Sequence, residues 1–125
     1  MPKYVDYEMP AELVPQIVEM ISVAREGGKL KKGVNETTKA IERKTALFVV
    51  LAQDVTPEEI VTHIPMICKE KGIPYGFVTT KKELGDAIGI KVGVSAVAVE
   101  NAGAATEKLQ DIIKKLPKPK EEKKK

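Results

Sequence analysis

Hydrophobic residues recur at helical spacing near the start of the chain. Across residues 11–26 the apolar side chains fall three and four positions apart, and two glycines follow them. This spacing predicts an amphipathic helix that ends at Gly27 and Gly28. A short strand is predicted at residues 30–32, and a second helix from about residue 35 to residue 44.

Three continuous apolar runs predict the strands of a sheet. Residues 45–52 and 74–80 are rich in apolar residues that favour strands, as expected of strands buried on both faces. Residues 92–99 form the third run. Residues 91–96, which overlap the start of this run, are small, apolar and interrupted by glycine, which also suits a loop packed against a flat partner. On the residues alone a core strand is favoured.

Helical segments are expected between and after these strands. Thr56, Pro57 and Glu59 match a capping box that starts a helix running to Lys71, and Pro65 must kink or divide this helix. Strands that alternate with helices predict an α/β fold, a three-layer α-β-α sandwich around a small mixed sheet of about four strands. Two further helices are predicted at residues 81–88 and 104–116.

The length of 125 residues is that of one domain. We expect residues 1–116 to form that domain and residues 117–125, with five Lys and two Glu, to be a disordered tail. Because only 4% of the residues are aromatic, an aliphatic core is predicted.

No apolar run approaches the ~20 residues that cross a bilayer, and no secretory leader opens the chain. The single Cys cannot form an internal disulfide, so a cytoplasmic protein without membrane association is expected.

The net charge of +3 is unevenly distributed along the chain. The tail alone carries +3, which leaves residues 1–116 neutral with sixteen basic and sixteen acidic residues. Within that neutral body, residues 25–44 contain seven basic and three acidic residues, a local charge of +4. One basic sector on a neutral protein predicts a local anionic partner rather than a polyelectrolyte bound over the whole surface.

Side chains able to carry catalysis are isolated from one another. His63 and Cys68, the only residues of their kinds, fall in one predicted helix among apolar residues. A packing or surface role is favoured for His63, and a buried packing role for Cys68. Asp54 follows a strand, where an enzyme could keep an acid, but no second carboxylate is paired with it and a turn residue is favoured. The chain contains neither a GxxxxGKS/T nor a GxGxxG motif. We therefore expect no enzymatic activity, no cofactor and no metal site.

The stretch from Lys31 to Lys39 carries the strongest sign of a ligand. Two lysines and a glycine precede the start of a helix, where unpaired N–H groups and a partial positive charge favour phosphate. Asn35, Glu36 and Lys39, placed in the first turn, combine donors and acceptors as reading a base edge requires. The alternative is that Asn35 caps a solvated, charged helix, and both interpretations stay open on the residues alone.

Residues 32–39, Lys-Gly-Val-Asn-Glu-Thr-Thr-Lys, resemble the KGxNExTK signature of the archaeal kink-turn-binding ribosomal protein family (L-seven-Ae, of the wider thirty-e superfamily). Three further blocks, at residues 54–65, 71–75 and 81–89, resemble the family in the same order. The resemblance implies a protein that recognises the kink-turn, a sharply bent RNA helix–loop–helix element with tandem sheared G·A pairs.

The resemblance also implies a role for each motif residue. Asn35, Glu36 and Lys39 would contact the guanines of the G·A pairs. The remaining positions form three groups: the basic side chains would hold phosphates on either side of the bend, one pair would flank the extruded loop nucleotide, and the last segment would cap the loop bases. The phosphate-binding group is Lys32, next to Gly33, together with Arg43 and Lys44. The pair at the extruded nucleotide is Ile60 and Lys81. The capping segment contains Val92, Val94, Ser95 and Ala96.

The implied partners are kink-turns of ribosomal RNA, box C/D and box H/ACA guide RNAs and ribonuclease P RNA, together with guide-particle core proteins. A monomer is expected when the protein is free. One alternative is the RNA-binding domain of an RNA-modifying enzyme, for whose catalytic half the chain is too short. Another is a translation- or stress-related module of the same superfamily, which would have no reason to keep Asn35, Glu36 and Lys39 together.

Overall fold

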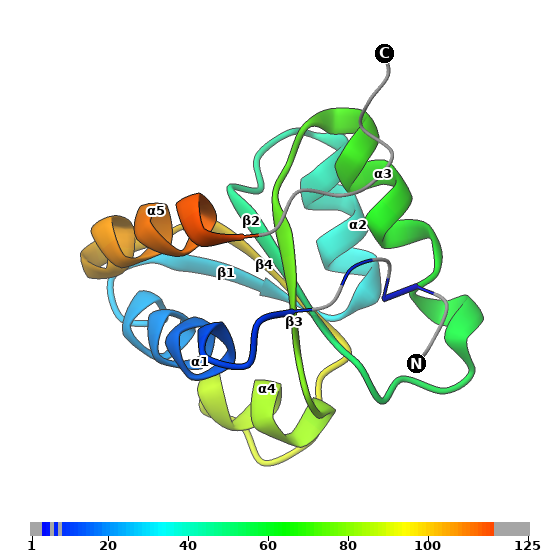
Figure 1. Cartoon of the computed structure of the whole chain (residues 1–125), viewed down its shortest axis with the longest axis horizontal. Coiled ribbons are helices and arrows are strands. Elements are labelled where there is room, and N and C mark those ends of the chain that lie inside the picture. Colours follow the sequence, from blue (N-terminus) through cyan, green and yellow to red (C-terminus); the bar gives the residue numbers. More distant parts are fainter. Residues whose placement is uncertain (1–3, 6, 8, 117–125) are drawn as a thin grey trace.

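The computed structural model describes residues 4, 5, 7 and 9–116, which form alternating helices and strands (Figure 1). In chain order these elements are α1 (Leu13–Ala24), β1 (Lys29–Lys32), α2 (Val34–Glu42), β2 (Phe48–Ala52), the 3-10 turn η1 (Glu58–Ile60), α3 (His63–Lys71), β3 (Tyr75–Val78), α4 (Lys81–Ala87), β4 (Ala96–Asn101), the 3-10 turn η2 (Gly103–Ala105) and α5 (Thr106–Lys115). The predicted α/β class is confirmed.

The four strands form one mixed sheet in the order β1–β4–β2–β3. β2 and β3 are parallel, whereas β4 runs antiparallel to both β1 and β2. The C-terminal ends of β1, β2 and β3 therefore meet the N-terminal end of β4 at one edge of the sheet, which we call the carboxyl edge. The segments that leave strands at such an edge are where α/β folds place their ligands.

Helices cover both faces of this sheet and complete the three predicted layers (Figure 1). α1 packs against α4 and α5 on one face, and α2 packs against α3 on the other. The amphipathic pattern of α1 explains its position, because Leu13, Ile17 and Ile21 all lie on its buried side. No helix in the described part of the chain is long and apolar enough to cross a membrane.

The core contains every aromatic residue of the chain, so the prediction of an aliphatic core was incomplete. Tyr4, Tyr7, Phe48, Tyr75 and Phe77 are all buried. The Phe77 ring meets Tyr7 and Tyr75 edge-on, with centroid separations of 5.3 and 5.9 Å. Most of the other buried hydrophobic residues are Val, Ile, Leu and Ala, as the composition predicts.

The predicted capping box at Thr56 is wrong. Pro57 has an extended backbone (φ −70°, ψ 152°) and precedes only the short turn η1. α3 begins later, at His63, and Pro65 lies in its first turn, where a proline is tolerated. The expected division of this helix therefore occurs before Pro65.

The third predicted strand begins later than its apolar pattern suggests. β4 starts at Ala96, and residues 92–95 belong to the loop that connects α4 to it. The loop interpretation of the glycine-interrupted segment is therefore correct for most of its length. The predicted tail, residues 117–125, lies outside the described residues.

Candidate nucleic-acid interface

The start of α2 is shaped by Gly33. This residue has φ 95° and ψ 157°, a conformation open almost only to glycine, and its carbonyl accepts the first helical hydrogen bond from Thr37 at 3.0 Å. No side chain among the described residues caps the helix, and the N–H groups of residues 34–36 have no hydrogen-bond partner there. These donors are available to an anion.

Asn35, Glu36 and Lys39 share the solvent-exposed side of α2. The opposite side, which includes Ala40 and Ile41, is buried. Asn35 is the second helical residue and Gly33 holds the cap position, so the alternative in which Asn35 caps the helix is wrong. Lys39 lies in the second turn rather than the first, yet four residues separate it from Asn35 and keep the two on one face.

Three hydrogen bonds hold the α4–β4 loop to the other segments at the carboxyl edge. Gly33 N donates to Ala96 O at 2.8 Å, and Ala52 N at the end of β2 donates to Ser95 O at 3.0 Å. Val94 N donates to Lys81 O, at the start of α4, over 3.1 Å. The starts of α2, α4 and β4 and the end of β2 are thus joined through backbone groups.

A second set of contacts fixes Lys81 at the start of α4. Its N–H donates to Asp54 Oδ1 at 2.8 Å, so the Asp54 carboxylate acts as a helix cap rather than a catalytic acid. Thr80 Oγ1 accepts from Glu83 N at 3.0 Å, and Glu83 Oε1 accepts from Thr79 N at 3.2 Å. This capping arrangement was missed by the sequence analysis, although the Thr-x-x-Glu pattern at residues 80–83 could have revealed it.

The loop segment predicted to cap RNA bases is divided by burial. The side chain of Val92 is 66% exposed, whereas Val94 is 7% exposed and Ala96 is fully buried. Ser95 is half-buried. Val94 and Ala96 therefore face the core and anchor the loop, and only Val92 and Ser95 can present side chains to a ligand.

Other predicted residues lie at different places around this edge. Ile60 is 43% exposed on η1, which follows β2, and Lys81 opens the helix that follows β3. Because β2 and β3 are parallel neighbours, both residues follow the carboxyl edge. Arg43 and Lys44 instead follow the C-terminal end of α2, roughly 12 Å along the helix axis from Asn35. The structure does not bring these two to the carboxyl edge.

A model of the family described as "Ribosomal protein L7Ae/L30e/S12e/Gadd45 family" matches residues 16–109, from α1 to α5. The chain belongs to this family. The L7Ae/L30e match includes all the residues predicted to bind RNA. As a member of a ribosomal protein family, the chain is not an enzyme.

Individual relatives agree with this membership of the L7Ae/L30e family. The chain is 53% identical over 116 residues to "Large ribosomal subunit protein eL8" from two strains of Halobacterium salinarum, with 93% of this chain and 97% of the relative covered. Its fold matches the "Giardia lamblia 15.5kD RNA binding protein" with a TM-score of 0.87 and 28% identity, over 93% of this chain and 97% of that one.

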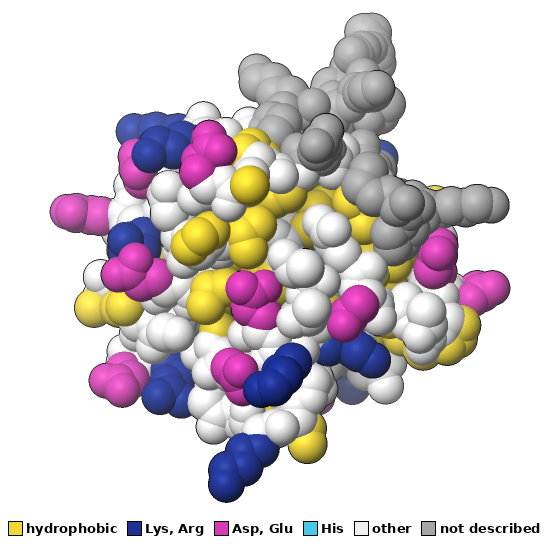
Figure 2. All heavy atoms as spheres, turned by 60° about the horizontal axis from the view of Figure 1, so that its bottom comes forward, with side chains coloured by type: hydrophobic (Ala, Val, Ile, Leu, Met, Phe, Trp, Pro, Cys, Tyr) yellow, Lys and Arg dark blue, Asp and Glu magenta, His cyan; other side chains and the backbone are white. Residues whose placement is uncertain are grey.

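The basic sector of this L7Ae/L30e member keeps most of its charge free. Among the described residues, only Lys29 of the window 25–44 has an ion pair, with Glu100 at 3.6 Å. Figure 2, in which the bottom of Figure 1 with α4 comes forward, shows acidic and basic side chains interspersed on that face.

His63 and Cys68 have structural surroundings. His63 Nε2 lies 2.9 Å from Thr38 Oγ1, which joins α3 to α2 behind the exposed side of α2. Cys68 is buried in the same helix. The packing roles predicted for both residues are confirmed.

Proposed function

We propose that this protein binds kink-turn RNA and recognises its tandem sheared G·A pairs. The observation that carries the proposal is the exposure of Asn35, Glu36 and Lys39 together at the start of a helix that no described side chain caps. The family membership and the RNA-binding protein of similar fold support it.

The chemistry of the three side chains suits a sheared pair. Such a pair leaves the guanine N1–H free to donate, which suits the acceptor-only carboxylate of Glu36. The guanine O6 and N7 stay free to accept, which suits the donor-only ammonium of Lys39. Asn35 supplies both functions. The free N–H groups of residues 34–36 and the Lys32 ammonium bind the adjacent phosphates.

The segments around the carboxyl edge hold the loop of the kink-turn. Ile60 and Lys81 flank the extruded nucleotide, with the apolar side chain against the base and the ammonium near its phosphate. Val92 covers the neighbouring loop bases, and Ser95 lies beside it. Arg43 and Lys44 meet phosphates of the stem that runs along α2.

Binding shifts the RNA towards its bent form. Bent and extended kink-turns exchange, and a protein that contacts only the bent one raises its population by its differential affinity. We infer that the protein acts in this way in the large ribosomal subunit, as the name of its Halobacterium relatives suggests, and therefore in the cytoplasm. The protein also binds the kink-turns of box C/D and box H/ACA guide RNAs, together with their core proteins, and of ribonuclease P RNA. It does so as a monomer.

A gel-shift titration tests the proposal. One RNA carries the kink-turn, and its matched control has the G·A pairs replaced by Watson–Crick pairs. Loss of two base contacts predicts roughly hundredfold weaker binding to the control RNA. A variant without residues 117–125 should lose affinity for both RNAs but keep the ratio between them. Equal affinity of the full chain for the two RNAs would overturn the proposal.

A further inference from the structure

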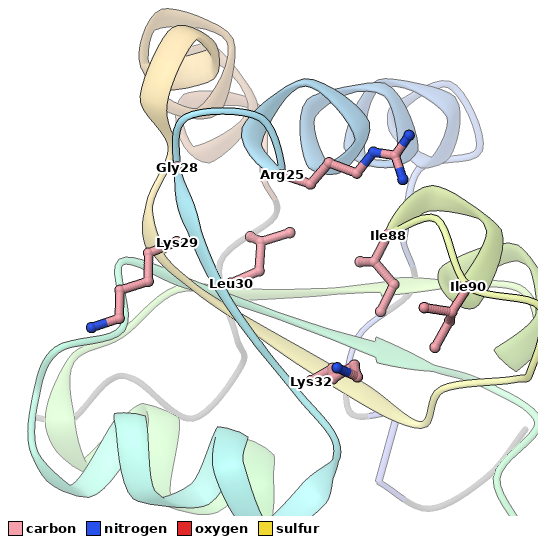
Figure 3. A pocket seen from close by; sticks show the side chains of 7 residues that line it. All are labelled: Arg25, Gly28, Lys29, Leu30, Lys32, Ile88 and Ile90. Atoms are coloured by element: carbon pink, nitrogen blue, oxygen red, sulfur yellow. The ribbon is translucent and has the colours of Figure 1, made fainter.

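A groove follows β1, the free edge strand of the sheet, on the side covered by α1 and α4 (Figure 3). It encloses about 350 Å³ between the end of α1, β1 and the residues that leave α4. We call it the β1-edge groove. Its main lining residues are Arg25, Lys29, Leu30, Lys32, Ile88 and Ile90.

The groove has an apolar floor and a cationic rim. Leu30, Ile88 and Ile90 are half-buried and supply the floor. Arg25 and Lys32 are exposed at the rim, and neither forms an ion pair with any described residue. Among the described residues, no acidic side chain lines the groove. A ligand with anionic groups on an apolar framework fits this combination.

The Arg25 guanidinium lies beside the turn after α4. Gly89 has φ 85°, and a Cβ at this position would overlap the guanidinium. The missing side chain therefore makes room for Arg25 against the turn. A planar guanidinium in this position can bind a phosphate through two parallel hydrogen bonds.

The groove is continuous with the carboxyl edge. Lys32 is the last residue of β1 and lines the groove. It directly precedes Gly33, where the proposed RNA site begins. Ile88 and Ile90 lead directly into the loop that carries Val92. From Lys29 to Lys32 the strand extends the site by roughly 10 Å.

We propose that the β1-edge groove binds the sugar–phosphate backbone of one RNA stem as it leaves the kink. Arg25 and Lys32 contact phosphates, and the floor lies against the apolar faces of riboses. This inference rests on the proposed function, and continuity with that site favours RNA over an acidic protein segment. It adds Arg25, about which the family motif says nothing, to the RNA-binding residues.

The test compares three kink-turn RNAs: one with both stems cut to a few base pairs, and two in which either stem is extended by a helical turn. The wild type should bind one of the extended RNAs more tightly than the short one. Arg25→Ala should remove this gain, roughly threefold to tenfold, and reduce the salt slope for that RNA by about one. Its affinity for the short RNA should stay unchanged.

Two further variants serve as controls. Lys115→Ala removes one exposed charge on α5 and should keep the gain, and Arg25→Lys should keep most of it. Arg25 is exposed, so a thermal melt should show unchanged folding. If Arg25→Ala binds all three RNAs with the affinity of the wild type, the inference is overturned. An acidic segment of a protein would then be the better candidate for the occupant of the groove. Loss of G·A discrimination by the wild type would instead overturn the proposed function itself.

Discussion

The backbone N–H of Gly33 donates a hydrogen bond of 2.8 Å to the carbonyl oxygen of Ala96. This bond joins the residue that precedes α2 to the first residue of β4. The polar residues of α2 and the loop that ends at Ala96 are therefore fixed relative to each other by the backbone. In the proposed complex, the side chains that read bases and those that cover loop bases are therefore positioned before RNA binds.

Substitution of Gly33 should separate these two segments. Gly33→Ala places a side chain in a conformation that costs on the order of 1–3 kcal/mol in unfolding free energy. We expect kink-turn affinity to fall about tenfold as well, because the start of α2 must shift. Urea unfolding and gel-shift titration measure the two effects.

The matched control is Gly72→Ala at the end of α3. Gly72 also has positive φ, 73°, with open space where a Cβ would lie. Its substitution should cost about 1 kcal/mol of stability and leave RNA affinity unchanged. A similar loss of affinity in both variants would show that the effect comes from stability and not from the Gly33–Ala96 connection.

The exposed and buried valines of the α4–β4 loop should respond differently to a charge. Val92→Asp should change the unfolding free energy by no more than about 0.5 kcal/mol, because the side chain is 66% exposed. Its affinity for kink-turn RNA should fall about tenfold through lost apolar contact and repulsion from phosphate. Val94→Asp, in contrast, should lose several kcal/mol of stability, roughly the cost of a buried charge.

A neutral variant separates the two causes at the exposed position. Val92→Ser removes the apolar contact without adding a charge, so its loss of RNA affinity should be smaller than that of Val92→Asp. Unchanged RNA affinity of a folded Val92→Asp protein, with folding checked by circular dichroism, would exclude the proposed contact with loop bases.

The Tyr4 phenol should make stability depend on alkaline pH. It donates to Ala52 O at 2.6 Å and accepts from Val55 N at 3.3 Å. Burial raises the pKa of Tyr4, and the nearby carboxylates of Asp54 and Glu58 raise this pKa further, against a lowering by the Val55 N–H. The folded state therefore keeps the proton that the unfolded state loses near pH 10, so the contribution is complete below about pH 10 and falls above it.

The comparison of wild type with Tyr4→Phe isolates this effect, because all other groups titrate in both proteins. At pH 8 the variant should be less stable by about 1–2 kcal/mol, the loss of a buried hydrogen bond. The difference should shrink as the pH rises above about 10. Urea unfolding at several pH values measures it, and a difference that stays constant across that range would contradict the assignment.

Local patterns predicted the sheet and α2 well. The apolar run at residues 45–52 predicted a strand buried on both faces, and every residue of β2 within that run is buried. The exposed side of α2 followed from its polar residues. These features depend on short stretches of chain, which is why the sequence was sufficient.

Non-local packing decided what the sequence did not predict. Thr56–Glu59 and Thr80–Glu83 share one capping pattern, yet only the second caps a helix, because Pro57 takes an extended conformation. The opposite exposures of Val92 and Val94 depend on the bond between Val94 and Lys81. The contact of Arg25 with Gly89 joins segments far apart in the chain, and no local pattern marks it.

The role of Glu36 is the point at which base reading and simple charge attraction predict opposite results. Glu36 is an anion within the most basic window of the chain, and no described residue forms an ion pair with it. Charge attraction alone predicts that Glu36→Gln binds every RNA more tightly. Base reading predicts the loss of a charge-assisted hydrogen bond to guanine N–H, at a cost of about 1–3 kcal/mol. Repulsion from phosphates is screened over about 8–10 Å and is the smaller effect.

The most direct measurement is the affinity of Glu36→Gln for a kink-turn RNA and for a plain duplex. The control is Glu42→Gln, which removes the same charge at the other end of α2. We predict that Glu36→Gln binds the kink-turn roughly tenfold to hundredfold more weakly and the duplex equally or slightly more tightly. Glu42→Gln should show no loss on either RNA. Tighter binding of Glu36→Gln to both RNAs would contradict base reading and leave Glu36 as a solvated charge on the helix.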